Sequence, residues 1–142
     1  MEIRFTENFI ELCEQSNLNQ KQIAKEIGIN QSQISRYLKG ILPDIKTVVK
    51  IADYFNHSID YMIGLIDNEE KTSKKGYNPS MFYKNYQYLL NKNNTTHYQL
   101  AKNKIVCETS LRLWKKDTLP KFEVICNIAY YLGGSVDELL GR

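Results

Sequence analysis

The chain lacks any apolar run that approaches the roughly 20 residues of a membrane-spanning helix. It also lacks the charged start, apolar stretch and small-residue cleavage site of a secretory signal. Its three cysteines are an odd number with no close pair, so they do not indicate a disulfide framework. These absences favour a reduced, cytoplasmic protein that does not enter a membrane.

Features of catalytic and metal sites are missing as well. The two histidines, His57 and His97, are isolated, and neither has a second metal ligand at helical spacing. No nucleophile–base pair and no glycine-rich phosphate loop is visible. We therefore expect neither an enzyme nor a bound metal or cofactor.

What the sequence has is a repeat. Residues 3–65 align with residues 80–142 at a constant offset of 77, without a gap and with 16 identities in 63 positions. The identities include the Leu-Pro pairs at 42–43 and 119–120. Each copy has about 65 residues, near the lower limit for a domain that folds alone. The repeat predicts two domains of one fold.

The segment between the copies, DNEEKTSKKG at residues 67–76, has no apolar residue and predicts an exposed linker. We therefore expect domains at residues 1–66 and 77–142, joined by a linker at 67–76. When fully extended, ten residues span roughly 33–36 Å. The net charge is −1 for residues 1–66 and +4 for residues 77–142. This balance predicts the stronger attraction to nucleic acid in the second half, and a solvated lysine surface is the alternative that gives the same charge.

No alternating strand pattern appears, and the periodicity predicts an all-α fold with five short helices per domain. Helix starts are marked by Asn19 with Gln22 three residues later, and by Thr96 with Gln99, which are two potential capping boxes. Gly28 is suited to the left-handed end of a helix. Two short helices on either side of residues 28–30 predict a helix-turn-helix.

The second of these helices has an unusually polar start. Amide and hydroxyl side chains and one guanidinium are expected to face outward, a set that suits base edges. These residues are Gln31, Ser32, Gln33, Ser35 and Arg36. A face that served only solubility would more often be lysine and glutamate.

Residues 18–36, with Ala24, Gly28 and Gln31 at fixed separations, resemble the lambda-repressor-like family, also called the xenobiotic-response-element family of helix-turn-helix proteins. Residues 43–64 are similar to the family's closing two helices. The resemblance implies that the helix at about 31–39 enters the major groove of double-stranded DNA. It implies base or backbone contacts from the outward-facing set above. It also implies that Gln20 contacts a phosphate and braces Gln31, and that Lys39 and Lys46 meet phosphates.

The second half keeps the fold pattern and changes the contact positions. Ile105 replaces Gly28, and a β-branched residue is costly in a left-handed turn, so we expect the bend at Asn103 or Lys104. At the contact positions Gln31 becomes Glu108 and Arg36 becomes Leu113. Contacts to DNA remain an open expectation for His97, Glu108, Thr109, Arg112, Lys115 and Lys116.

The sequence as a whole predicts a sequence-specific DNA-binding transcriptional regulator, of repressor type, from a bacterium or a mobile element. The second domain would add phosphate contacts, a second half-site, or a surface for a homodimer or a protein partner. The alternative is a protein-interaction module, such as an antitoxin or antirepressor, that keeps the fold and uses the second domain for oligomerisation.

Overall fold

The computed structural model describes residues 2–67, 71–72 and 74–142, and they divide into two compact units, Glu2–Gly76 and Tyr77–Arg142. Described residues are helical or irregular, with no strand, so the predicted all-α fold is confirmed. Within those residues no helix is long and apolar enough to cross a membrane.

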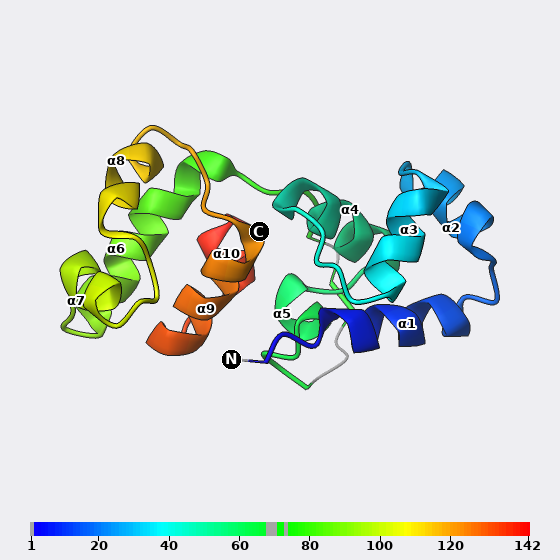
Figure 1. Ribbon diagram of the computed structural model, residues 1–142, viewed down its shortest axis with the longest axis horizontal. Helices are drawn as coiled ribbons and strands as arrows, with labels where there is room; N and C mark the ends of the chain where they lie inside the picture. Colours follow the sequence, from blue (N-terminus) through cyan, green and yellow to red (C-terminus); the bar gives the residue numbers. More distant parts are fainter. Residues whose placement is uncertain (1, 68–70, 73) are drawn as a thin grey trace. The chain divides into compact units, whose positions relative to one another are not determined.

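The described residues of the first unit form five α-helices, shown from blue to green in Figure 1. They are α1 Phe5–Gln15, α2 Gln20–Ile27, α3 Gln31–Leu38, α4 Ile45–Phe55 and α5 Ile59–Met62. Their core is aromatic at one end, because the ring of Phe9 stacks on Phe5 and meets Tyr37 and Phe55 edge-on. Contacts of α3 with both α1 and α2 fix the helix-turn-helix on this core.

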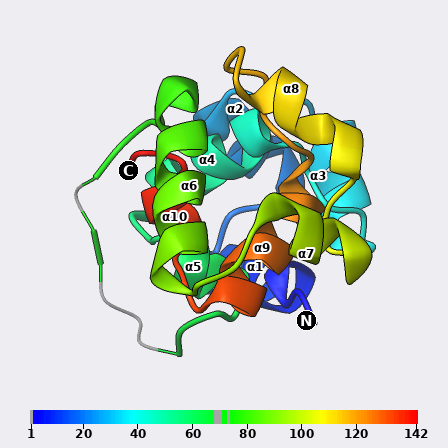
Figure 2. The same ribbon diagram turned by 90° about the vertical axis from the view of Figure 1, so that its left-hand side faces the viewer.

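The second unit also has five α-helices, which are labelled in Figure 2. They are α6 Phe82–Lys92, α7 His97–Lys102, α8 Leu111–Trp114, α9 Phe122–Leu132 and α10 Val136–Leu139. Short 3₁₀ turns precede two of them, η1 at Pro79–Met81 and η2 at Glu108–Ser110. Asn78 caps η1, and a proline occupies its first turn.

The backbones of the two units share special positions. Four of the left-handed backbone positions of the first unit recur 77 positions later. The pairs are Asn17 and Asn94, Gly40 and Asp117, Asn56 and Gly133, and Gly64 and Gly141. In both units these left-handed residues lie at the same places between the helices, and the helices follow one another in the same order.

Two pairs of side-chain contacts also recur at this offset. Asn8 Nδ2 donates to the carbonyl of Tyr61, 3.1 Å away, and Asn85 Nδ2 donates to the carbonyl of Glu138 at the equivalent place. A tyrosine of the fourth helix likewise contacts the end of the second helix in each unit. Tyr54 hydrogen-bonds to Glu26, and Tyr131 accepts from Asn103. Identical residues at these positions are therefore explained by packing rather than by ligand contact.

The segment predicted as a free linker is partly held against α4. Lys71 Nζ donates to the carbonyl of Phe55 at 3.1 Å, and the amide of Thr72 donates to that of Asn56 at 2.8 Å. The amide of Gly76 donates to Asp53 Oδ2 at 2.9 Å. The first two bonds satisfy backbone carbonyls at the end of α4 that have no partner within the helix, and the third engages the carboxylate of Asp53. The extended span expected for residues 67–76 therefore does not apply from Lys71 onward, and residues 68–70 and 73 lie outside the described part.

A test of the first unit's fold concerns Asp44, which caps the N-terminus of α4. Its Oδ1 accepts from the amide of Thr47 at 2.9 Å, and the hydrogen bonds from Thr47 lower the pKa of the Asp44 carboxyl. Asp44→Ala should reduce the free energy of unfolding by about 0.5–2 kcal/mol at neutral pH. Because the folded pKa lies below the unfolded one, the carboxylate stabilises the fold above about pH 4, and this contribution falls as pH drops through the folded pKa. Urea titrations of both proteins at neutral and acidic pH measure the difference, and a gap that widens in acid would contradict the role.

Candidate nucleic-acid interface

The turn between α2 and α3 is built on Gly28. Its φ is +87°, and an added Cβ would meet nothing within 4 Å, so glycine is favoured by backbone conformation rather than by space. The amides of Gly28 and Ile29 both donate to the carbonyl of Ala24 at 2.9 Å. Ala24 and Ile34 are buried where the two helices pack. The predicted helix-turn-helix geometry is therefore present in this unit.

Helix α3 exposes its first turn. Asn19 caps α2 through a full capping box with Gln22, as predicted, and this places Gln20 at the exposed start of α2. Six predicted contact residues are exposed on α2, α3 and the start of α4. They form what we call the contact face: Gln20, Gln31, Ser32, Arg36, Lys39 and Lys46.

Gln33 differs from its expected role. Its Oε1 accepts from the amide of Asn30 at 2.9 Å, and its Nε2 donates to the hydroxyl of Tyr37 at 3.3 Å. Both ends of the amide are therefore engaged inside the helix, and the side chain is half-buried. Ser35 is also half-buried. Gln33 therefore caps the helix, a role that competes with the predicted contact to bases or backbone. No hydrogen bond joins Gln20 to Gln31 among the described residues.

The equivalent turn in the second unit is displaced by one residue. Lys104 adopts a φ of +61°, and the amide of Ile105 donates to the carbonyl of Leu100 at 2.9 Å. The same type of bond in the first unit joins Ile29 to Ala24. Ile105 thus avoids the left-handed conformation, and the bend predicted at Asn103 or Lys104 is confirmed at Lys104. Helix α7 consequently ends at Lys102.

His97, expected as a possible DNA contact, belongs to the core of the second unit. Only 8% of its surface is exposed, and the rings of Tyr86 and Trp114 meet it edge-on. Its Nδ1 lies 2.8 Å from the hydroxyl of Tyr86, and its Nε2 lies 3.0 Å from the carbonyl of Cys107. A carbonyl only accepts, so Nε2 carries a proton and donates. The histidine ties α6 and η2 together and is not available to a phosphate.

The hydroxyl of Tyr86 completes this arrangement. Burial raises the pKa of the Tyr86 hydroxyl far above its usual range. Since Nε2 is the donor nitrogen of His97, Nδ1 accepts a hydrogen bond from this hydroxyl. With Phe82, whose ring stacks on Tyr86, the four rings form what we call the aromatic quartet: Phe82, Tyr86, His97 and Trp114. The first unit has Phe5, Phe9, Gln20 and Tyr37 at the same positions.

The remaining candidates of the second unit are exposed. They are Glu108 and Thr109 in η2, Arg112 in α8, and Lys115 and Lys116 directly after it. The helix that corresponds to α3 begins here as a 3₁₀ turn and is only four residues long in its α-helical part. Leu113, at the position of Arg36, is 47% exposed.

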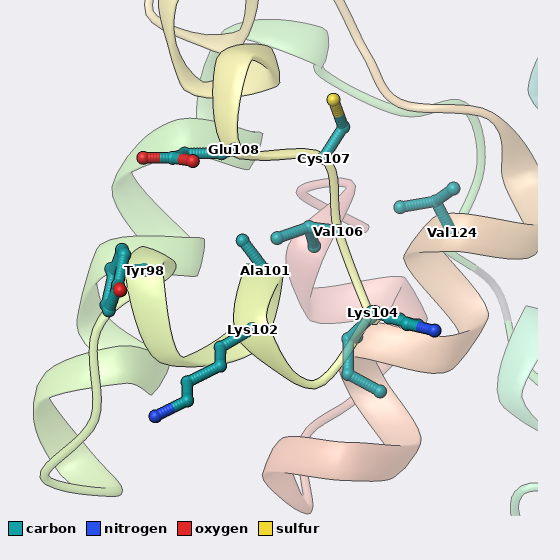
Figure 3. A pocket seen from close by; sticks show the side chains of 9 residues that line it. Tyr98, Ala101, Lys102, Lys104, Val106, Cys107, Glu108 and Val124 are labelled. Atoms are coloured by element: carbon teal, nitrogen blue, oxygen red, sulfur yellow. The ribbon is translucent and has the colours of Figure 1, made fainter.

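A cavity of about 610 Å³ lies beside the displaced turn. Figure 3 shows its lining, in which the ammonium groups of Lys102 and Lys104 point in different directions. Cys107 is exposed there, and the hydroxyl of Thr109, 3.3 Å from its sulfur, lowers the pKa of the thiol. Cys13 and Cys126 are buried, and burial raises the pKa of Cys13 to about 11. Among described residues, no group of three or more His, Cys, Asp or Glu side chains is placed to hold a metal ion.

One family of known proteins matches a segment that lies within the first unit. The sequence model of a family described as helix-turn-helix matches residues 10–62. The crystal structure of a transcriptional regulator from Listeria innocua is 27% identical to this chain, with a TM-score of 0.43, and the match covers 80% of this chain and 97% of that one. No curated protein matches. The matched segment includes all of α2, the Gly28 turn and α3.

Proposed function

We propose that the chain is a sequence-specific DNA-binding transcriptional regulator of repressor type, in which the first unit inserts α3 into the major groove. The observation that carries this proposal is the exposed start of α3. Gln31, Ser32 and Arg36 project from a helix that the Gly28 turn and the buried Ala24 hold rigidly against α2. Amide and guanidinium groups form the bidentate hydrogen bonds that distinguish adenine and guanine.

Electrostatics gives the contact face a second role. Arg36, Lys39 and Lys46 place three cations on the exposed side of the helix-turn-helix, although residues 1–66 have a net charge of −1. Phosphate attraction therefore comes from the local arrangement of these cations and not from the unit as a whole. Helix N-termini of α2 and α3 add amide donors for phosphate oxygens.

We also propose that Tyr77–Arg142 is a second, diverged copy of the first unit. Support comes from the left-handed positions, the asparagine contacts and the tyrosine contacts that recur 77 residues apart. The divergence includes contact positions, where His97 is buried and Glu108 and Leu113 replace Gln31 and Arg36. The second copy therefore contributes little base readout.

The experiment that tests this function is selection of bound sequences from a random duplex pool with the full chain. Enrichment of a motif with guanine or adenine at fixed positions is the expected result. A palindromic motif would mean that the first units of two chains bind its halves. A two-part asymmetric motif would mean that both units of one chain bind.

A protein-interaction module is the second candidate, and the exposed loop after α3 favours it. Ile41 is 46% exposed there, where a basic residue would help to hold DNA. No enrichment in the duplex selection would exclude the regulator and leave this alternative.

A further inference from the structure

The second unit departs from the first where α7 ends. This helix ends at Lys102, whereas α2 continues to Ile27, the residue that aligns with Lys104. The cavity of about 610 Å³ lies beside the segment that follows α7. Its volume falls within the roughly 300–1,000 Å³ of sites that bind small molecules. We call it the turn cavity, and its lining is Tyr98, Ala101, Lys102, Lys104, Ile105, Val106, Cys107, Glu108 and Val124.

The turn cavity has an apolar floor. Figure 3 shows Ala101 and Val106 near the middle of the lining, with Val124 on a neighbouring helix. Val106 is buried, and the other two are half-buried. Tyr98 adds an aromatic ring that is 60% exposed, and such a ring stacks on flat apolar groups. A lining of this kind favours a ligand with a flat apolar body.

The polar part of the lining attracts an anion. Lys102 and Lys104 are exposed, and neither ammonium group has an ion-pair partner among the described residues. Glu108 is the one carboxylate of the lining, and Figure 3 places it at the opposite end from Lys104. The sulfur of Cys107 also points away from Lys104. An acidic group is therefore attracted most strongly at the Lys104 end of the cavity and repelled at the Glu108 end.

Two backbone amides of the lining, those of Val106 and Cys107, have no hydrogen-bond partner among the described residues. In the first unit the equivalent amides are engaged, because Ile29 donates to Ala24 and Asn30 donates to a side chain of its own helix. The displaced turn of the second unit breaks this pattern. An amide without a protein partner is satisfied by water or by a ligand, and an ionised acid is a strong acceptor for it.

The lining thus combines an apolar floor with a cation and two amide donors. We propose that the turn cavity binds a small organic anion with a flat apolar body, whose acidic group accepts hydrogen bonds from Lys104 and from the amides of Val106 and Cys107. The apolar body covers Ala101 and Val124. This site goes beyond the proposed DNA-binding function, and it does not need DNA to be occupied.

Two matched probes separate the acidic group from the apolar body. Anilinonaphthalene sulfonate carries a sulfonate on its aromatic rings, and its fluorescence rises when it leaves water. Phenylnaphthylamine has the same rings without the sulfonate. Titration of the full chain without DNA should give a dissociation constant of roughly 10–100 μM for the sulfonate probe.

The thiol of Cys107 reports whether the probe occupies the turn cavity. Cys107 lines the cavity and is exposed, whereas Cys13 and Cys126 are buried. Iodoacetamide alkylates an accessible thiolate, and mass spectrometry of the intact protein gives the rate. Saturating sulfonate probe should slow alkylation of Cys107 about fivefold, because the bound probe covers the thiol. An unchanged rate would place the probe elsewhere on the protein and overturn the proposal.

Substitutions at the two ends of the cavity should have opposite effects on the sulfonate probe. Lys104→Asn removes the cation and keeps the turn, because asparagine readily adopts the left-handed backbone of this position. It should raise the dissociation constant about fivefold, and Glu108→Gln, which removes the opposing carboxylate, should lower it about twofold. Lys84→Asn is the matched control, since it makes the same charge change on α6 outside the cavity and should leave the constant unchanged.

The neutral probe should respond to none of these substitutions, and circular dichroism verifies that each variant is folded. Equal effects of Lys104→Asn and Lys84→Asn on the sulfonate probe would overturn the proposal, because net charge alone would explain them. An equal response of the neutral probe to Lys104→Asn would overturn it too, since the loss would then come from a change in cavity shape. If Lys104→Asn does not fold, Glu108→Gln and the alkylation rate still decide. Because no DNA is present, a negative result leaves the DNA-binding proposal standing, and a failed duplex selection leaves this site standing.

Discussion

Gln31→Ala should weaken binding of the full chain to its selected DNA site by about 1–3 kcal/mol per site and relax the preference at one base. Gln31 is the first residue of α3, and its side chain is exposed, so its amide is free to form two hydrogen bonds with an adenine edge. Fluorescence anisotropy against the selected duplex, and against duplexes changed at one base pair at a time, gives both quantities.

A matched control for this prediction is Gln15→Ala. Gln15 is also exposed and belongs to the same unit, but it is the last residue of α1 and lies outside the contact face. Its replacement should leave both affinity and base preference unchanged. Equal losses for Gln31→Ala on the selected and on random duplexes would show that Gln31 contacts only the backbone, and the assignment of base readout would fail.

The helix-turn-helix was predictable because its signals are local. Gly28 supplies the left-handed turn, and Asn19 with Gln22 forms the predicted capping box. The capping role of Gln33 was not predicted, for a reason that is also local. The side-chain amide of a residue three positions after a helix cap can accept a hydrogen bond from the backbone amide of the cap. In α3 this bond competes with an outward orientation of the Gln33 side chain.

The displaced turn of the second unit was predictable from steric cost alone. A β-branched residue at the position of Gly28 excludes the original turn, and the chain places Lys104 in the left-handed region instead. The burial of His97 was not predictable in this way. It depends on Tyr86, which is distant in sequence and adds a hydroxyl where the first unit has Phe9.

The replacements in the second unit at the positions of Gln20, Phe9 and Tyr37 depend on one another. A histidine at the position of Gln20 is buried only if its two nitrogens find partners, and the hydroxyl of Tyr86 and the carbonyl of Cys107 supply them. Trp114 covers the ring at the position of Tyr37. The sequence contained each replacement, but only the fold shows that they are neighbours. In the second unit, a position expected to contact phosphate thereby became part of the core.

Trp114→Ala should reduce the free energy of unfolding of the second unit by about 3–5 kcal/mol, because it removes the largest ring of the aromatic quartet and leaves a cavity. Only 4% of Trp114 is exposed, and its ring lies 5.2–5.4 Å, centroid to centroid, from the other three. Urea denaturation followed by circular dichroism measures the loss. Tryptophan fluorescence is unsuitable, because the substitution removes the single tryptophan of the chain.

Leu113→Ala is the control for this substitution, because Leu113 is adjacent in sequence but 47% exposed. Its replacement should change the free energy of unfolding by no more than about 0.5 kcal/mol, as for most surface positions. A loss below about 1 kcal/mol for Trp114→Ala would mean that neighbouring side chains fill the space left by the ring without strain. The aromatic quartet would then not be what holds the short α8. The burial of His97 would also not explain why the second unit lacks a contact residue at the position of Gln20.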